Sequence, residues 1–412
     1  MGISESRPMS FIERFATCWG SPVMHFTLGG RFTEALIREA MLKVRRRNPL
    51  LRCTVENENF IVSDASECDS INLPVTIHEF RGTAADRFAA AERLAWRELG
   101  FNMVPRNLWR MTFHYDGSGC DMVFLFHHSI LDGMSCFSIM EDFLNACKGM
   151  ELKPRAMSVP METVLPRHAK AVEGKRPDIN ADWLKITDFE PVKQPIYTHC
   201  AAVKIPPAVF AEIRNECRLR SVTFHGALMA ASLFATDNEL PKIYTDVSTR
   251  RWCNPQLEPS YPGIYLGQIV WAAKAQKDLP FWQNAQRLQL ELQEHIINGE
   301  HLAPNADCVI TATGPESFNI TNMHSSIAPG GFSMNSAAGA FAVSITPEVP
   351  RFPIVLVVVS VNDACILNLC YHRNFWTRAR AVDVLSEMVR MLSERGAGLA
   401  PQKIEVLVQP EK

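Results

Sequence analysis

The sequence contains no apolar run long enough for a membrane-spanning helix. The run from Ile354 to Val361, which includes a serine, is far too short, because a spanning helix needs about 20 apolar residues. The chain also has little net charge, with 42 lysine and arginine residues against 44 aspartate and glutamate residues. It therefore has no strongly basic field that would hold a phosphate backbone. We expect neither a membrane span nor a nucleic-acid partner.

The cysteine spacings of a zinc site or a disulfide framework are also missing. Twelve cysteines are scattered along the chain without a C-x-x-C pair, and the closest two are Cys365 and Cys370. Zinc sites usually have paired ligands at shorter spacing, so we expect no bound metal. Residues 1–14 are polar and contain no apolar core of a secretory signal. Many cysteines without a framework are typical of a reducing compartment, and we expect a cytoplasmic protein.

What the sequence does have is length and apolar content. It contains 412 residues, of which 47% are hydrophobic and 21% are charged. Domains usually contain about 100 to 200 residues, so we expect two lobes rather than one. A chain of this size buries a large core and needs no disulfide or metal staples.

Helical and strand patterns alternate along the chain, which predicts a mixed α/β architecture. Apolar residues recur at helical spacing after the N-cap candidates Thr33, Thr223 and Thr377. Further helices are predicted at 84–99, 135–146 and 281–296, and after residue 207. Strands are predicted at 109–115, 121–127, 199–205, 353–361 and 364–371. The turn residues 116–119 and 362–363 join two pairs of these strands as hairpins.

Between about residues 151 and 190 the composition changes. Pro154, Pro160, Pro166 and Pro177 interrupt a polar stretch with weak periodicity. Such a stretch is typical of a connection between domains. We therefore divide the chain into an N-terminal lobe at 1–150, a connection at 151–190 and a C-terminal lobe at 191–412.

The most informative stretch is HHSILDG, from His127 to Gly133, which follows the apolar strand residues 122–126. Side chains alternate along a strand, so His127 and His128 should point to opposite faces. One of them can face a cavity while the other packs or hydrogen-bonds in the interior. The two histidines therefore cannot share one role.

A histidine in such a position can serve as a general base. A neutral imidazole has an unperturbed pKa of about 6.5, so much of it is available to accept a proton near pH 7. Acyl transfer to an alcohol needs a base for the hydroxyl proton, and a thioester donor is already activated. No enzyme nucleophile is then obligatory, and the sequence has no G-x-S-x-G elbow and no catalytic-cysteine signature.

Each member of this stretch also has a purely structural interpretation. A lone histidine at a strand end is more often a satisfied core or surface residue than a catalyst. Asp132 could be the N-cap of the next helix, with Ser135 at N3. Gly133 could be a turn glycine. The full set at this spacing, directly after an apolar hairpin strand, favours a functional site over these separate explanations.

The stretch HHSILDG matches the HHxxxDG motif of the condensation-domain and CoA-dependent acyltransferase superfamily, which includes chloramphenicol acetyltransferase, alcohol acetyltransferases and polyketide-associated acyltransferases. Weaker similarities follow in the family's order over most of the chain. They are RNPLLR at 47–52, VTFHGAL at 222–228, VSTR at 247–250, TNMH at 321–324 and LNLCY at 367–371. The DFGWG motif of the plant members is absent.

This resemblance implies two chloramphenicol acetyltransferase-like lobes that form a V with a central tunnel. It implies that His128 faces the tunnel as general base, with His127 in a supporting place. Asp132 would turn away from substrate and pair bidentately with an arginine. That arginine matches Arg250, or Arg251 if the register is shifted by one. Gly133 would leave room for the pantetheine arm of the donor.

Asn322 occupies the asparagine position of the segment that matches SNlG in the family, and His324 stands where glycine is usual. Asn322 is either a site residue or a turn asparagine. The structure has to decide between these two interpretations.

The resemblance therefore implies an acyltransferase of specialised metabolism that moves an acyl group from acyl-CoA to a hydroxyl of a small-molecule acceptor. Acyl-CoA is a co-substrate, and no bound cofactor is expected. The alternatives are a donor held on an acyl carrier protein, an amine acceptor, or an inactive homologue that only binds. No adenylation or carrier-protein segment follows the second lobe, which favours a stand-alone enzyme. One chain supplies both walls of the expected tunnel, so a monomer is compatible with this reading.

Overall fold

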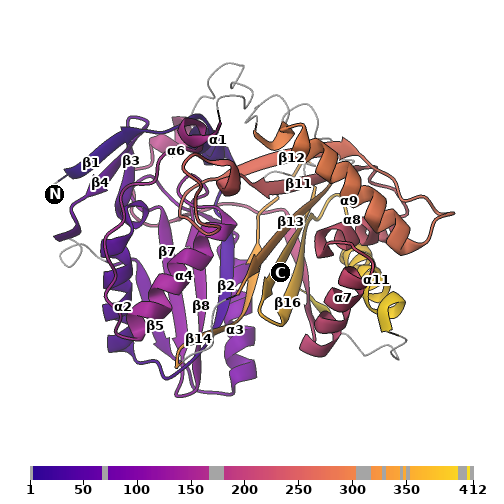
Figure 1. Ribbon diagram of the computed structural model, residues 1–412. Helices are drawn as coiled ribbons and strands as arrows, with labels where there is room; N and C mark the ends of the chain where they lie inside the picture. Colours follow the sequence, from indigo (N-terminus) through magenta and orange to yellow (C-terminus); the bar gives the residue numbers. More distant parts are fainter. Residues whose placement is uncertain are drawn as a thin grey trace.

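The structure is a computed structural model that describes residues 3–66, 73–166, 181–302, 317–326, 331–343, 347–348, 353–397 and 406–408. Two large β-sheets, each covered by helices, make up most of it (Figure 1). The predicted mixed α/β fold class is confirmed. The V shape and the continuous tunnel stay predictions. None of the described helices is long and apolar enough to cross a membrane.

The first sheet has five strands in the order β14-β2-β8-β7-β5. These strands are β14 (Ser333–Ala340), β2 (Val23–Gly29), β8 (Gly119–Phe126), β7 (Trp109–Tyr115) and β5 (Val75–Glu79). Helices α2 (Glu34–Arg47) and α4 (Gly133–Cys147) pack on one face, and α3 (Ala84–Glu98) packs on the other. The predicted hairpin is present as β7 and β8, paired in antiparallel register.

The second sheet has seven strands in the order β12-β11-β13-β15-β16-β10-β17. They are β12 (Leu266–Ala272), β11 (Lys242–Ser248), β13 (Ser317–Ser325), β15 (Ile354–Val361), β16 (Ala364–His372), β10 (Thr198–Ile205) and β17 (Val406–Val408). Four helices share one hydrophobic core with it: α7 (Pro207–Leu219), α8 (Phe224–Ala235), α9 (Phe281–Ile297) and α11 (Arg378–Ala397).

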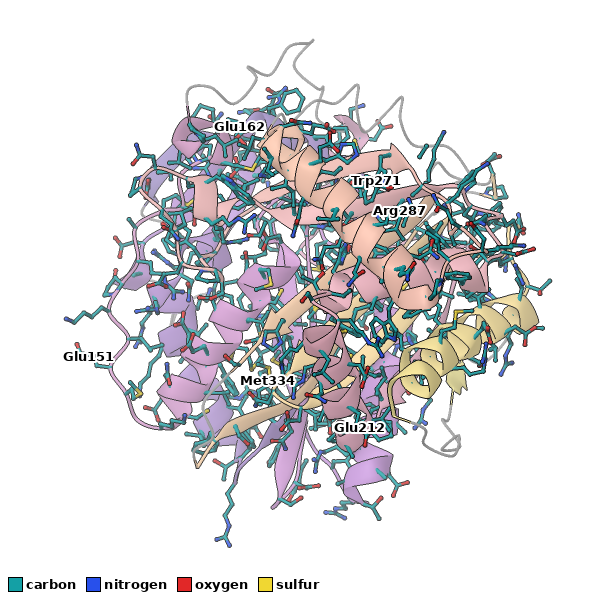
Figure 2. The ribbon with its side chains drawn as sticks, turned by 45° about the vertical axis from the view of Figure 1, so that its right-hand side comes forward. Glu151, Glu162, Glu212, Trp271, Arg287 and Met334 are labelled. Carbon is teal, nitrogen blue, oxygen red and sulfur yellow. The ribbon has the colours of Figure 1, made fainter. Side chains whose placement is uncertain are left out.

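Helix α9 lies over the end of this sheet that contains β12. In Figure 2, Trp271 of β12 and Arg287 of α9 lie close together. Glu291 connects them, because Trp271 Nε1 donates to its Oε2 at 3.2 Å and Arg287 donates to its Oε1. The α9 side of the sheet is thus covered, and the other side is left for contact with the first half of the molecule.

Strand β14 joins the two halves. It lies late in the chain, yet it pairs antiparallel with β2 of the first sheet, from Ser333 opposite Gly29 to Ala340 opposite Val23. In Figure 1 the orange β14 accordingly lies among the purple strands. The lobe boundary predicted at residue 191 did not anticipate that a C-terminal strand would be exchanged into the N-terminal sheet.

Strand β15 is buried on both faces, which explains its continuous apolar sequence. Val355 and Val357 belong to the core of the first half, whereas Leu356 and Val358 belong to the core of the second. The side chains of one strand therefore contribute to both hydrophobic cores.

The helix starts follow from local capping. Thr33 and Thr223 accept hydrogen bonds from the backbone of Leu36 and Gly226, as predicted. The helix expected from about Ser135 begins at Gly133, because Asp132 is its N-cap. The prediction missed a three-stranded sheet at the N-terminal edge. It consists of β1 (Ile3–Pro8), β4 (Asn59–Ser63) and β3 (Cys53–Glu56).

The connection predicted at 151–190 contains two short helical turns. They are α5 (Met161–Val164) and α6 (Ala181–Leu184), and residues 167–180 between them lie outside the described residues. Trp183 of α6 is buried and donates a hydrogen bond to the carbonyl of Met103 at 2.7 Å. This end of the connection packs against the first half, whereas Met161 and Val164 of α5 pack with Ile264 and Tyr265 of the second half.

Gly267 of β12 tests the packing at this end of the second sheet. A Cβ at this position would lie 1.8 Å from the carbonyl oxygen of His301, a backbone atom that cannot simply rotate away. We expect Gly267→Ala to lower the free energy of unfolding by about 1–3 kcal/mol or more, as overpacking does. Gly117→Ala is the matched control, because a Cβ there meets no atom within 4 Å. Equal urea midpoints for the two variants would contradict the expectation.

Candidate active site

His128 lies directly after β8, in the turn that leads to α4. Its backbone N–H donates to the carbonyl of Gly20 at 3.3 Å, which fixes the turn against the preceding loop. Its ring stands edge-on to Trp19, with ring centroids 5.0 Å apart. The ring is partly exposed, and it lines a cavity of about 280 Å³.

The cavity lies between the two large sheets. Its walls come from β2, the end of β8 and the start of α4 on one side, and from β11, β12, β13 and β15 on the other. The end of β14 and Phe341 after it complete the lining. Most of the lining side chains are apolar, which is usual for a small-molecule site. Neither half of the chain forms this cavity alone.

His127 points away from the cavity. It is fully buried, stacks on Trp183 with ring centroids 4.4 Å apart, and its Nδ1 lies 2.7 Å from the Ser129 hydroxyl. Burial, with a smaller effect of the neighbouring His128, lowers the pKa of His127 to about 3. His127 is therefore neutral and structural. The predicted division between the two histidines agrees with this geometry, although β8 ends one residue before His127.

The environment of His128 keeps its imidazole neutral at physiological pH. Burial lowers its pKa, and the Asp132 carboxylate and nearby backbone carbonyls offset this only in part. Nδ1 is buried and has no hydrogen-bond partner in the described part of the chain. Nε2 is the other ring nitrogen, and His128 as a whole is partly exposed and lines the cavity. A neutral ring with an accessible nitrogen can accept a proton.

Asp132 and Arg250 form a buried ion pair. Arg250 Nη2 lies 2.8 Å from Asp132 Oδ1, and their side chains are 1% and 0% exposed. Arg251, the alternative partner, is exposed instead and lies over Trp252. The pair uses a single guanidinium nitrogen, so the expected bidentate geometry is wrong. The other nitrogens are directed elsewhere: Arg250 Nε donates to the carbonyl of Tyr261 at 2.9 Å.

Asp132 also binds backbone on both sides of the cavity. Its Oδ1 accepts from Ser135 N–H at 2.9 Å, which caps α4, and its Oδ2 accepts from Tyr265 N–H at 3.0 Å. Burial opposes ionisation of Asp132, but Arg250 and these N–H donors outweigh it and lower its pKa. The N-cap interpretation and the ion-pair interpretation therefore both hold. Asp132 points away from the ring of His128 and holds the turn in place.

Gly133 lies at a close contact between the two halves. A Cβ there would lie 2.2 Å from the sulfur of Met323, which belongs to β13. The space that Gly133 leaves free is thus occupied by the Met323 side chain in this structure. The role of that space for a pantetheine arm stays a prediction.

Asn322 lies within strand β13, so it is not a turn asparagine. It contributes to the cavity lining, and its Oδ1 is buried without a hydrogen-bond partner among the described residues. The neighbouring Thr321 and Met323 also line the cavity. The structure brings Asn322 to the site but gives it no defined polar contact.

The sequence analysis missed a polar cluster on the wall opposite His128. Tyr244 and Asp246 of β11 and Gln268 of β12 line the cavity there, beside Thr321 and Asn319 of β13. The sequence contained one signal for this cluster: Tyr244 and Asp246 are two positions apart in a strand, so their side chains lie on the same face. Only the pairing of β11 with β13 shows that these side chains meet.

No cluster of three or more histidine, cysteine, aspartate or glutamate side chains that would suit a metal ion occurs within the described ranges. The arrangement at the cavity is instead a neutral histidine, an ion pair near it and hydrogen-bonding groups on the wall of the second sheet. Such a site can take a proton from a bound hydroxyl or amine without a metal ligand set.

Several solved structures share this fold over nearly the whole chain. The structure of polyketide synthase associated protein 5 from Mycobacterium tuberculosis has a TM-score of 0.69 at 15% identity, and the match covers 96% of this chain and 100% of that one. The first condensation domain of the CDA synthetase has a TM-score of 0.69 at 12% identity, with 98% and 100% covered.

TRI3 trichothecene 15-O-acetyltransferase from Fusarium sporotrichioides has a TM-score of 0.61 at 14% identity, with 94% and 95% covered. No protein-family model and no curated protein sequence matches the chain. At such low identities the comparisons establish the fold, which is that of condensation domains and of an O-acetyltransferase.

The charge of Asp132 can be tested by Asp132→Asn, which keeps an N-cap side chain but leaves Arg250 buried without its partner. We expect a loss of about 3–5 kcal/mol in the free energy of unfolding near neutral pH. Because the folded pKa of Asp132 is lowered, its contribution is complete above the unfolded value of about 4 and is lost at lower pH. The difference between parent and variant should therefore narrow in acid.

The control is Asp182→Asn, which removes an exposed ion pair with Lys185 and should cost less than about 1 kcal/mol. Urea unfolding of both variants at several pH values measures these differences. A loss for Asp132→Asn that is as small as that of the control would contradict a structural role for the buried pair.

Proposed function

We propose that the protein is an acyltransferase that moves an acyl group from acyl-CoA to a hydroxyl of a small-molecule acceptor. The observation that carries this proposal is the partly exposed ring of His128 in a cavity between the two halves of the molecule. His128 acts as the general base. The fold shared with an O-acetyltransferase and with condensation domains supports the same class of reaction.

In the proposed reaction, Nε2 of His128 accepts the acceptor's hydroxyl proton while the hydroxyl oxygen attacks the thioester carbonyl carbon. The tetrahedral intermediate then loses the thiolate as its carbon–sulfur bond breaks. His128 returns the proton to the thiolate. The products are the ester and the free CoA thiol, and the enzyme is regenerated. No enzyme nucleophile and no redox partner are needed, because the thioester is already activated.

The lowered pKa of His128 supports its role as a base rather than as an acid. A ring that is already neutral at physiological pH can accept a proton without first losing one. Its partner Asp132 is held by Arg250 and by backbone N–H groups, so it fixes the turn instead of relaying protons. His127, stacked on Trp183, supports the same turn from the other side.

The cavity volume of about 280 Å³ is near the lower end for ligand pockets, which usually measure about 300–1,000 Å³. Met323 contributes to this narrowness, since it packs against Gly133. Rotation of its flexible side chain widens the passage without a backbone change. A small acceptor beside the reacting end of the donor therefore fits the site better than two bulky substrates.

A second candidate uses a donor held on an acyl carrier protein, or acylates an amine. This candidate is supported by the presence of condensation domains among the similar structures. Both candidates share the base and the cavity. They differ in what holds the thioester and in which atom receives the acyl group.

His128→Ala tests the base. We expect kcat to fall by about 10²- to 10⁴-fold, the usual contribution of a well-placed general base. Release of CoA thiol from mixed acyl-CoAs with a panel of alcohols measures turnover, and product mass identifies the acceptor. His78→Ala is the control, because His78 is exposed and lies away from the cavity. Turnover of His128→Ala at the parent rate would remove His128 from the mechanism.

The pH dependence of kcat/KM tests the protonation state of His128. Only the neutral ring accepts a proton, and burial lowers its pKa, so kcat/KM should rise with pH around a midpoint below 6.5. This limb should disappear in His128→Ala. An acid limb centred above 6.5, or one that survives in the variant, would assign the titration to another group.

A donor comparison separates the two candidates. The same acyl group is supplied on CoA and on a purified acyl carrier protein, and product formation is followed by mass spectrometry. We expect the higher kcat/KM with acyl-CoA. A clear preference for the carrier-bound donor would favour the condensation-type alternative and leave the role of His128 unchanged.

A further inference from the structure

The cavity contains a carboxylate that has no counter-ion. Asp246 of β11 contributes to its lining, and none of the described lining residues is lysine or arginine. The other titratable lining groups are His128, which is neutral, and Tyr244, whose pKa burial raises far above its usual value. The nearby Asp132 is already paired with Arg250. The carboxylate of Asp246 therefore faces the cavity without a cationic partner among the described lining residues.

Neighbouring side chains fix the position of this carboxylate. Thr321 Oγ1 donates to Asp246 Oδ2 at 2.5 Å, and Gln268 Nε2 donates to Oδ1 at 3.5 Å. The hydroxyl of Tyr244 supplies a third hydrogen bond. A carboxylate offers about four acceptor positions, so a further donor can bind. These neutral donors orient Asp246 but do not balance its charge.

A hydrogen-bond acceptor without a partner lies on the same wall of the cavity. Asn319 is 8% exposed, lines the same cavity, and its Oδ1 has no partner within the described part of the chain. Asn319 is paired in register with Tyr244, two residues before Asp246 on the same strand. Buried polar atoms nearly always have partners in native proteins, so the unpaired Oδ1 of Asn319, on the same wall as a carboxylate without a counter-ion, indicates a ligand that carries donors.

Burial raises the pKa of Asp246 to about 6, against the hydrogen bonds from Thr321 and Gln268, and Asp132 adds a smaller effect in the same direction. At neutral pH the carboxylate form still predominates. An isolated charge in an apolar cavity is costly, and a bound cation offsets that cost. A protonated amine supplies both the positive charge and several N–H donors.

We propose that Asp246 determines acceptor specificity by binding a protonated amine on the molecule whose hydroxyl is acylated, so that the acceptor is an amino alcohol. This inference rests on the proposed function for the hydroxyl end of that molecule. The ammonium group binds between Asp246 and Asn319, and the hydroxyl faces His128 on the other wall. The amine keeps its proton and is not the atom that is acylated.

The experiment measures binding without a donor, so that chemistry does not enter. Calorimetric titration uses linear amino alcohols of increasing chain length, each beside the diol of equal length. We expect one length of amino alcohol to bind more tightly than its diol. Asp246→Asn should weaken that amino alcohol by about tenfold to a hundredfold, as expected for a hydrogen bond to a charged group. The diol should change by less than about twofold.

The control is Asp237→Asn, which removes an exposed carboxylate that is paired with Lys277. His128→Ala should retain the preference for the amino alcohol, which separates the two proposals. If His128→Ala stops turnover yet no amino alcohol is preferred at any length, the role of Asp246 is refuted and the function stands. Equal weakening of amino alcohol and diol in Asp246→Asn would also overturn the inference, because it would indicate a merely structural carboxylate.

A pH titration gives a second readout. Binding of the amino alcohol should weaken as the pH falls through about 6, where Asp246 becomes protonated and its charge is lost. The amine itself stays protonated over this range. Binding of the diol should stay level. A loss of amino alcohol binding that persists unchanged in Asp246→Asn would assign the titration to another group.

Discussion

The buried contact between Asp132 and Arg250 is the constraint on which the site depends. Asp132 begins α4, directly after the turn that carries His128, and Arg250 follows β11 of the other sheet. Tyr265 N–H binds the second oxygen of the same carboxylate, so one side chain holds two segments of the second half. Such a pair adds little net stability, since desolvation offsets most of the attraction. Its contribution is to position the two halves, because Asp132 caps α4 of the first half and binds Arg250 and Tyr265 N–H of the second.

The two walls of the cavity supply different chemistry. The first sheet provides His128, the proposed base, after the end of a hairpin whose geometry is fixed by local pairing. The second sheet provides hydrogen-bonding side chains. Its neighbouring strands β11 and β13 run parallel and place Asn319 and Thr321 beside Tyr244 and Asp246. In the proposed reaction the substrate is therefore recognised and activated from opposite sides. The cavity exists only where the two sheets meet.

Local features of this architecture could be predicted from the sequence. The β7–β8 hairpin, the capped helices and the opposite orientation of His127 and His128 all follow from short-range periodicity and turn chemistry. The pairing of Asp132 with Arg250 came only from family resemblance, because the two residues are far apart in the chain. Asp246 was missed for a related reason. A polar residue in a strand gains meaning from its neighbours on adjacent strands, and strand order is set by tertiary packing.

The exchange of β14 has a consequence for how the chain is made. Ribosomal synthesis delivers β2, β8, β7 and β5 long before residues 333–340, so the first sheet forms with β2 as its outer strand. Unpaired backbone groups along an apolar outer strand invite association with other chains. An N-terminal half without residues 333–340 exposes this edge, and exposed edges make incompletely folded species prone to aggregation. Severing the gene between the halves would leave that strand permanently uncovered.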